Sequence, residues 1–331
     1  MENYRGRRTG AHGQGRIFEY CMKSLRAALF FSILSFSLAH AFQSSGYAIV
    51  NGARLWYEIA GAGEPLVLVA GGPGFSHVYF KPHFSQLWNF TVIYYDGIGR
   101  GRSDNAYIKS DYSIDRDVAD LEGLRVALNI EKWHIYGHSY GGLVAQQYAL
   151  QHQDHLLSLI LSNTMHSFEM WQEGYENYYN EIRNQYPEAW STIKRLADQG
   201  KKESSPEMRW ISIPTMPLIY FYDVSNVEKI VSDSLPWNAD VYYAIVGEEL
   251  FHLSPRLQNL DFRPRLREIN VPMLILAGRY DRIALPRYQI QYEIYAPQAE
   301  FHIFEKSGHF PFLEEPGSHI QLIREFLLRR Q

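Results

Sequence analysis

Three residues in separate parts of the chain have side chains that together could carry out acyl transfer. Ser139 is the middle residue of a Gly-His-Ser-Tyr-Gly segment, Asp281 ends the sequence Gly-Arg-Tyr-Asp, and His309 ends the sequence Ser-Gly-His. A serine hydroxyl is a weak nucleophile unless a base accepts its proton, and that base needs a third group to orient it. These residue types therefore predict a nucleophile (Ser139), an orienting acid (Asp281) and a histidine base (His309).

The segment around Ser139 has the pattern of a sharp turn between a strand and a helix. An apolar run at 133–136 precedes it, and a helix-like stretch follows at 143–150. Such a turn pushes the serine hydroxyl out above the edge of a sheet, and glycines two residues away on each side let the neighbouring backbone pass. The alternative is a Gly-rich turn whose serine only caps the helix.

Asp281 and His309 also follow apolar runs, at 273–277 and 300–304. Considered alone, Asp281 could be a turn residue and His309 a histidine of a surface loop. Three suitable side chains at three strand ends favour one catalytic site. The other histidines lack such a position and are expected to be structural or exposed.

A tetrahedral intermediate needs two fixed N–H donors for its oxyanion. The residue after the nucleophile, Tyr140, can supply one from its backbone. The second is expected from the Gly-Gly-Pro-Gly segment 71–74, which follows the apolar run 65–70, although this segment could be only a tight turn. Because Pro73 has no N–H, Gly72 is the preferred donor.

The elements expected to position these residues alternate between strands and helices. Continuous apolar runs at 65–70, 91–95 and 157–161 are typical of parallel strands that are covered on both faces. Residues 47–50 and 54–60 flank Asn51-Gly52, which predicts a hairpin with a type I′ turn. Helical stripes are expected at 113–128, 288–295 and 318–328. The pattern predicts an α/β fold with a mainly parallel central sheet and helices on both faces.

Between the two sheet-forming parts lies a helical stretch rich in Trp and Tyr. It predicts a helical cap at 166–261, inserted between a first core segment at 42–165 and a second at 262–331. The alternative is that these aromatic residues are further core.

Five segments together resemble the proline iminopeptidase family of α/β-hydrolases: 71–74, 96–103, 137–142, 278–281 and 307–309. The resemblance runs from about Tyr47 to the C-terminus and is weakest in the cap. It implies an α/β-hydrolase fold and a serine aminopeptidase that releases N-terminal proline from short peptides through an acyl-enzyme. It also implies that no metal or cofactor is needed, and that His309 acts first as base and then as acid.

Two departures from the family concern substrate recognition. Gly97 and Ile98 stand where the family has a polar pair, and Arg282 stands where some members have a glutamate. Glu249, or its neighbour Glu248, is expected to hold the substrate amine, although both could be ordinary solvated carboxylates. Two other functions remain open on the same scaffold: a carboxylesterase or lactonase for small apolar esters, and a ligand-binding receptor-like protein.

The N-terminal residues 1–41 read as a leader with a signal peptide. Lys23 and Arg26 precede an apolar run at 27–38 and an Ala-His-Ala site at 39–41. We expect export to the periplasm or medium, with an uncleaved membrane anchor as the alternative. Cleavage would remove the single cysteine and six of the basic residues, leaving a net charge of about −8. That charge disfavours nucleic acid as a partner; a small molecule or short peptide is expected, and the oligomeric state stays open.

Overall fold

The computed structural model describes residues 44–212, 215–229 and 237–329. The predicted leader and signal peptide at 1–41 lie outside the described residues. The expectations about export and cleavage therefore stay predictions.

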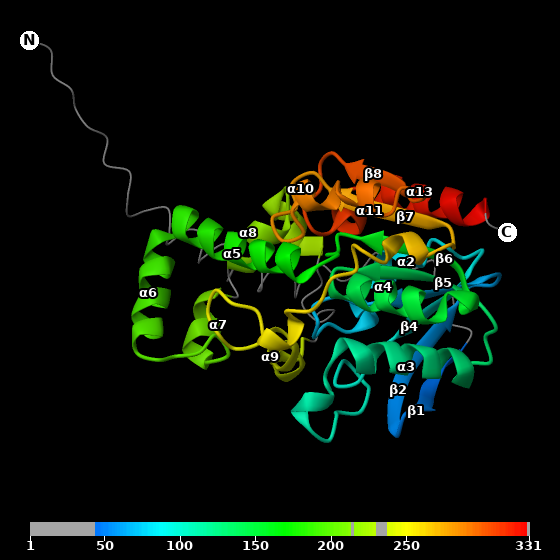
Figure 1. The fold of residues 1–331 in the computed structure, drawn as a ribbon, viewed down its shortest axis with the longest axis horizontal. Helices are drawn as coiled ribbons and strands as arrows, with labels where there is room; N and C mark the ends of the chain where they lie inside the picture. The colour runs from blue at the N-terminus through cyan, green and yellow to red at the C-terminus, as the bar shows by residue number, and fades with distance from the viewer. Residues whose placement is uncertain (1–43, 213–214, 230–236, 330–331) are drawn as a thin grey trace, which may run out of the picture. The chain divides into compact units, whose positions relative to one another are not determined.

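An eight-stranded sheet forms the centre of the fold, with the strand order β1-β2-β4-β3-β5-β6-β7-β8 (Figure 1). The pairs β1–β2 and β2–β4 are antiparallel, and all other neighbours are parallel. This confirms the predicted fold class. The strands are β1 (Ser44–Val50), β2 (Ala53–Ala60), β3 (Pro65–Val69), β4 (Thr91–Tyr95), β5 (Trp133–His138), β6 (Leu156–Ser162), β7 (Met273–Gly278) and β8 (Glu300–Phe304).

The N-terminal hairpin has the turn that its sequence predicts. Asn51 and Gly52 both have positive φ, at 47° and 82°, as a type I′ turn requires. Strands β1 and β2 consequently pair in register from Val50 with Ala53 to Ser44 with Ile59.

Side chains of the central strands alternate between two hydrophobic clusters, one on each face of the sheet. In β3, Val67 and Val69 belong to one cluster, and Leu66 and Leu68 belong to the other. Both sets are buried, so a polar position on either face would cost burial energy. This explains why the central strands read as continuous apolar runs rather than as alternating ones.

Helices cover both faces of the sheet. The first cluster receives α3 (Ile114–Ala127) and α4 (Tyr140–His152), and the second receives α2 (Lys81–Phe84) and α13 (Pro316–Leu328). Ser113 caps α3 by accepting a hydrogen bond from the Arg116 N–H. Shorter helices are α10 (Pro286–Gln289), α11 (Tyr292–Tyr295) and α12 (Pro311–Glu314).

The continuous helix predicted at 288–295 is wrong. The segment divides into α10 and α11, and the turn between them closes with i to i+3 bonds such as Gln291 N–H to the Tyr288 carbonyl. Gln289 is buried because its side-chain amide donates to the Thr164 carbonyl at 2.6 Å. This tertiary bond favours a bend that the helical periodicity does not indicate.

In the described part of the chain between β6 and β7, five α-helices gather to one side of the sheet in Figure 1. The two ends of this insertion meet, because Ser167 and Asp261 form an isolated β-bridge and the Phe262 N–H donates to the His166 carbonyl at 2.8 Å. The insertion thus leaves and rejoins the sheet at one place. Its helices are α5 (Phe168–Gln185), α6 (Pro187–Asp198), α7 (Pro206–Ser212), α8 (Met216–Tyr220) and α9 (Ala239–Val246).

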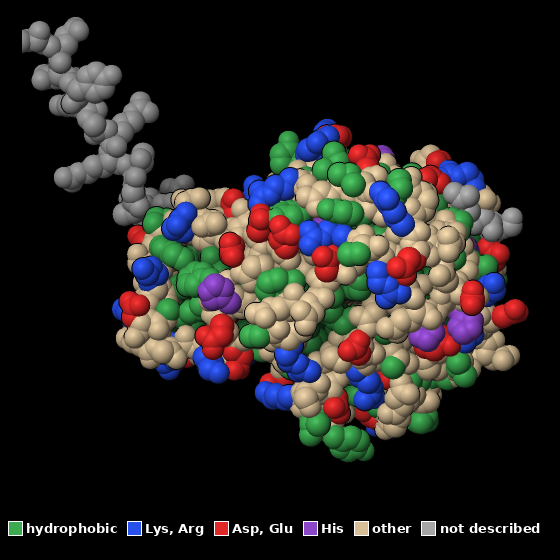
Figure 2. Space-filling view, in the orientation of Figure 1, with side chains coloured by type: hydrophobic (Ala, Val, Ile, Leu, Met, Phe, Trp, Pro, Cys, Tyr) green, Lys and Arg blue, Asp and Glu red, His purple; other side chains and the backbone are tan. Residues whose placement is uncertain are grey.

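The surface carries charges of both signs. On the face shown in Figure 2, Lys and Arg side chains are interspersed with Asp and Glu. Within the described residues, no helix is both long and apolar enough to span a bilayer.

Candidate active site

Ser139 occupies a strained turn between β5 and α4. Its φ and ψ are 54° and −122°, values that a non-glycine residue rarely adopts. The turn needs its glycines, because a Cβ on Gly141 would lie 2.1 Å from the Val69 carbonyl oxygen. Ser139 stands at the N-cap of α4, yet its hydroxyl makes no capping hydrogen bond. The hydroxyl is therefore not used as a helix cap, which removes the main alternative to a nucleophile.

Backbone contacts hold this turn from β6. The Ser139 N–H donates to the Ser162 carbonyl at 3.0 Å, and the Thr164 hydroxyl donates to the Ser139 carbonyl at 2.6 Å. The Gly142 N–H donates to the same carbonyl at 2.9 Å. With its backbone fixed in this way, Ser139 remains 9% exposed.

Asp281 and His309 meet at the ends of β7 and β8. His309 Nδ1 lies 2.8 Å from Asp281 Oδ2, and both side chains are buried. Asp281 also accepts hydrogen bonds from the N–H groups of Ile283 and Ala284 and from the Asn163 amide, at 2.8 to 2.9 Å. Because a carboxylate only accepts hydrogen bonds, the proton of the His309 ring must lie on Nδ1, which faces Asp281. The lone pair on Nε2 is then the one that can accept a serine proton.

Asn163 is a functional residue that the sequence reading missed. It follows β6 directly and has a φ of 48°, a conformation that asparagine tolerates better than most residues. Its side-chain amide donates to Asp281 Oδ2 and to the Gly308 carbonyl at 3.1 Å. One side chain thus connects the acid with the loop that carries the histidine. Its place at a strand end was the available signal.

The cap contacts the loop that carries His309. The His309 N–H donates to the Tyr220 carbonyl at 2.7 Å, and the two rings meet edge to face at 5.2 Å. Glu314 strengthens this junction, because its carboxylate accepts from the N–H groups of Gly308 and Tyr222 at 2.6 and 2.7 Å. The position of the histidine is therefore coupled to α8 of the cap.

The Gly-Gly-Pro-Gly segment lies beside Ser139, as an oxyanion loop must. A Cβ added to Gly71 would come within 3.0 Å of the Ser139 Cβ. Tyr140 is the first residue of α4, so its N–H has no partner within the helix. Among the hydrogen bonds between described residues, none is donated by the Gly72 N–H. Gly72 and Tyr140 line the same cavity as Ser139. An oxyanion hole needs N–H donors beside the nucleophile, so these two remain the candidates.

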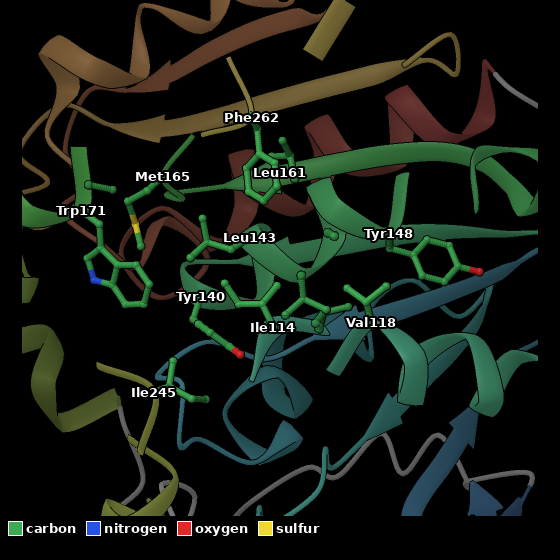
Figure 3. Packing of buried hydrophobic residues seen from close by; sticks show 14 of the residues in the cluster. Ile114, Val118, Tyr140, Leu143, Tyr148, Leu161, Met165, Trp171, Ile245 and Phe262 are labelled. Atoms are coloured by element: carbon green, nitrogen blue, oxygen red, sulfur yellow. The ribbon is translucent and has the colours of Figure 1, made fainter. Parts of the chain in front are cut away.

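A cavity of about 60 Å³ lies above Ser139 and is walled mostly by the cap. Met165, Trp171 and Tyr140 line it, and Figure 3 shows the side chains of Met165 and Trp171 beside Tyr140. The wall is strongly aromatic and suits a small apolar group. The aromatic residues lining it are Tyr140, Trp171, Tyr175, Tyr178, Tyr220, Trp237, Tyr242 and Tyr243.

Among the described residues that line this cavity, Glu203 is the one carboxylate. The residue is 6% exposed, and burial raises its pKa to about 8. The Tyr175 hydroxyl donates to Glu203 Oε2, and the Tyr243 hydroxyl donates to its carbonyl at 3.1 Å. No Lys, Arg or His of the described ranges forms an ion pair with Glu203. A desolvated acid without a cationic partner is suited to receive one from a ligand.

The structure does not bring the glutamates expected to bind an amine into the cavity. Glu248 pairs with Lys202 at 3.0 Å and is 40% exposed, and Glu249 is exposed. Arg282 lies 3.9 Å from Glu181 and does not line the cavity either. Glu203 stands in the polar run 200–205, which predicts solvent-exposed side chains, so the sequence carried no signal for its burial.

The described residues contain one cluster with the side chains of a metal site. Ligand atoms of Glu122, His152 and His155 lie within 4.8 Å of one another. Glu122 already accepts hydrogen bonds from Arg125 and from the Tyr148 hydroxyl, each at 2.6 Å. A guanidinium therefore occupies the place of a cation there, and none of these residues lines the cavity at Ser139.

Comparison with known proteins agrees with this geometry. The family model described as alpha/beta hydrolase fold matches residues 64–316, which is most of the chain. The chain belongs to the α/β-hydrolase family. Together with the relatives below, membership of this family identifies the protein as a hydrolase.

Several relatives of this α/β-hydrolase are proline iminopeptidases. The protein of that name from Heyndrickxia coagulans is 30% identical over 287 residues, covering 86% of this chain and 98% of the relative. The one from Saccharolobus solfataricus is 29% identical, with coverages of 85% and 91%. The crystal structure of proline iminopeptidase from Mycobacterium smegmatis superposes with a TM-score of 0.69 at 23% identity, covering 87% and 98% of the two chains. At that identity the structural likeness supports the fold alone.

Proposed function

We propose that this hydrolase is a serine aminopeptidase that releases N-terminal proline, or another small residue, from short peptides. The observation that carries the proposal is Glu203, a buried carboxylate in the wall of the cavity that holds Ser139. An aminopeptidase must recognise a free amine next to the bond it cleaves, and a desolvated carboxylate provides that recognition.

The arrangement of the site supports a two-step reaction. Ser139 Oγ attacks the carbonyl carbon while His309 Nε2 accepts the hydroxyl proton, and Asp281 stabilises the resulting imidazolium. The N–H groups of Gly72 and Tyr140 receive the negative charge on the carbonyl oxygen. His309 then gives its proton to the leaving amine, and an acyl-enzyme remains. Water, deprotonated by His309, releases the acyl group and regenerates Ser139.

The state of Glu203 explains how an amine would be selected. With a pKa of about 8, its carboxyl group is mostly protonated at neutral pH when the cavity holds no cation. An arriving ammonium favours the ionised form, so the carboxyl gives up its proton as the ion pair forms. The aromatic walls around Glu203 provide ring faces that attract a cation and exclude water. A neutral group gains neither the ion pair with Glu203 nor the attraction to the ring faces.

Two further facts support this specificity. Curated relatives that match nearly their whole length are proline iminopeptidases. The cavity above Ser139 is also small, which suits one compact residue better than a long acyl chain.

The test compares an amide substrate that has a free amine with an ester that lacks one. We expect the wild-type protein to release naphthylamine from proline β-naphthylamide, and Glu203→Gln to lower kcat/KM for this substrate by about 100-fold. Hydrolysis of p-nitrophenyl acetate should change less than about threefold. Glu249→Gln is the matched control and should leave both activities unchanged.

Two outcomes would contradict the proposal. The first is an active, pure protein that hydrolyses p-nitrophenyl esters but releases no proline, which would favour the carboxylesterase or lactonase alternative. The second is a Ser139 that does not react with a fluorophosphonate probe, which would remove the acyl-enzyme itself.

A further inference from the structure

The two groups proposed to bind the oxyanion come from different parts of the chain. Tyr140 belongs to the same turn as Ser139, whereas Gly72 belongs to a separate loop after β3. The distance between Gly72 and Ser139 therefore depends on what connects the loop to the turn. We propose that two buried hydrogen-bond chains, one through Tyr79 and one through Arg100, position Gly72 against Ser139 for the proposed acyl transfer.

The first chain runs from Gly71 to His138 through the Tyr79 hydroxyl. The Gly71 N–H donates to Tyr79 Oη at 2.8 Å, and Tyr79 Oη lies 3.0 Å from His138 Nδ1. On its other side, His138 Nε2 lies 2.8 Å from the His309 carbonyl oxygen. A carbonyl only accepts, so Nε2 must carry a proton.

The protonation of His138 fixes the direction of every bond in this chain. Burial lowers the pKa of His138 well below its usual value, so the ring is neutral and its Nδ1 is an acceptor. The Tyr79 hydroxyl must then donate to Nδ1 while it accepts from Gly71. Every hydrogen-bond donor in this chain then has an acceptor. The chain joins the oxyanion loop, the nucleophile turn and the backbone of His309.

The second chain runs from Pro73 to Tyr140 through an ion pair. Arg100 Nε donates to the Pro73 carbonyl at 2.5 Å, and its two Nη atoms form a fork with both oxygens of Asp117 at 2.7 and 2.8 Å. The Tyr140 hydroxyl donates to Asp117 Oδ2 at 2.6 Å. In Figure 3 this hydroxyl points away from Met165 and Trp171. Arg100 thereby connects the oxyanion loop to the residue after Ser139.

The two chains have matching ends. His138 and Tyr140 flank Ser139, whereas Gly71 and Pro73 flank Gly72. The loop is held on both sides of the donor, and the turn is held on both sides of the nucleophile. A shift of Gly72 relative to Ser139 would break bonds in at least one chain.

The residues in the middle of the two chains act through other residues and do not touch the substrate. Tyr79, Arg100 and Asp117 are buried, and none of them lines the cavity above Ser139. Removing one partner from a buried polar chain leaves the other unsatisfied, so the loop is expected to move rather than keep its place. They are therefore positioning residues, whose loss should weaken stabilisation of the oxyanion more than binding of the ester.

The test uses one substitution in each chain, with a matched control elsewhere. Tyr79→Phe removes the hydroxyl of the first chain, and Tyr148→Phe is its control because the Tyr148 hydroxyl also makes a short bond, to Glu122. Arg100→Lys removes the two-pronged ion pair with Asp117 and the contact with Pro73. Arg125→Lys is its control, because Arg125 likewise donates to both oxygens of one carboxylate, Glu122, and to a backbone carbonyl, that of Ile130. The measurements are kcat and KM with p-nitrophenyl acetate, melting temperature, and affinity for an alkyl trifluoromethyl ketone, whose adduct with serine carries an oxyanion.

We expect Tyr79→Phe and Arg100→Lys each to lower kcat by about 10-fold to 100-fold with KM changed less than about threefold. Affinity for the ketone should fall by the same factor as kcat/KM. The controls should lose melting temperature without this loss of ketone affinity. Should one variant fail to fold, the other decides, because each chain is predicted to act on the same Gly72.

The proposal is overturned if the folded variants keep wild-type kcat and ketone affinity, or if kcat falls while ketone affinity does not. Failure of the proposed function looks different. In that case the wild-type protein itself neither turns over the ester nor reacts with the ketone or a fluorophosphonate at Ser139.

Discussion

The sheet edge and the cap contribute to this site in different ways. At the sheet edge, Ser139, Asp281 and His309 are held by several short hydrogen bonds, many of them from backbone groups. In the cap wall, aromatic residues line the same cavity as the buried carboxylate of Glu203. The sheet edge holds the reacting groups in fixed positions, and the cap wall removes water from around a charged group. The chemistry and the choice of substrate can therefore be altered separately.

The separation is not complete, because α8 of the cap contacts the His309 loop. The Tyr220 carbonyl accepts from the His309 N–H, and Glu314 binds the backbone of both segments. A change at this junction should affect both regions. Ser139 and Asp281 belong to the sheet edge, and Glu203 belongs to the cap wall. Substitutions of these residues test whether catalysis and substrate choice can be changed separately.

The largest effect is expected from Ser139→Ala. Removal of the nucleophile should lower kcat roughly 10⁵-fold for proline β-naphthylamide and for p-nitrophenyl acetate alike. Ser318→Ala, which changes an exposed hydroxyl on α13, is the control. An equal loss on both substrates would show that one nucleophile serves both. Residual turnover of only one substrate would show that the two substrates do not share Ser139 as nucleophile.

Asp281→Asn should lower kcat by about 10³-fold to 10⁴-fold with little change in KM. Its oxygen would still accept from the N–H groups of Ile283 and Ala284, so its NH₂ would face His309. His309 Nδ1 must then accept a hydrogen bond instead of donating one, so the ring proton lies on Nε2, which can no longer act as base. The predicted signature is a loss of kcat on both substrates, with a lower melting temperature because the Asn163 amide loses its acceptor at Oδ2. A loss on the amide alone would place Asp281 in substrate recognition instead.

The difference between the two regions also explains what the sequence could predict. Ser139, Asp281 and His309 each follow an apolar strand within a few residues, so residue type and position after a strand were enough to propose them together. Glycines such as Gly141 mark positions where a Cβ has no room, and this constraint is visible in the residue type. Asn163 stands at a similar strand end, but asparagine in a turn has many ordinary explanations.

Glu203 could not have been found in this way. Its burial arises from contacts with Tyr175 on α5, Tyr243 on α9 and the backbone of Glu248, which lie far apart in the sequence. Local composition around Glu203 is polar and indicates exposure. Glu249, the residue expected to bind the amine, lies only one position beyond that backbone contact, yet its own side chain is exposed.

The pH dependence of the two substrates should differ because only one carries an amine. Below a pH of about 8, Glu203 is protonated and must lose a proton before it can pair with an ammonium. The ratio of kcat/KM for proline β-naphthylamide to that for p-nitrophenyl acetate should therefore rise with pH up to about 8, by up to tenfold per unit. A group that acts on both substrates, such as His309, affects both values alike and does not change the ratio. Glu203→Gln should flatten the ratio, and a ratio that does not change with pH in the wild type would remove Glu203 from amine recognition.

The smallest effect concerns stability. Glu203 has an ordinary pKa of 4.5 when unfolded and about 8 when folded, so between these values the folded state retains a proton that the unfolded state has lost. The free energy of unfolding of the wild type should then fall as pH rises through this window, by on the order of a few kcal/mol in total. Glu203→Gln cannot lose that proton. Its melting temperature relative to the wild type should therefore increase from pH 5 to pH 8 and level off above, whereas the difference for the exposed Glu249→Gln should stay constant. If the two differences follow the same course, the carboxyl of Glu203 is not desolvated in the folded protein, and the contrast between a rigid sheet edge and a charge-desolvating cap loses its basis.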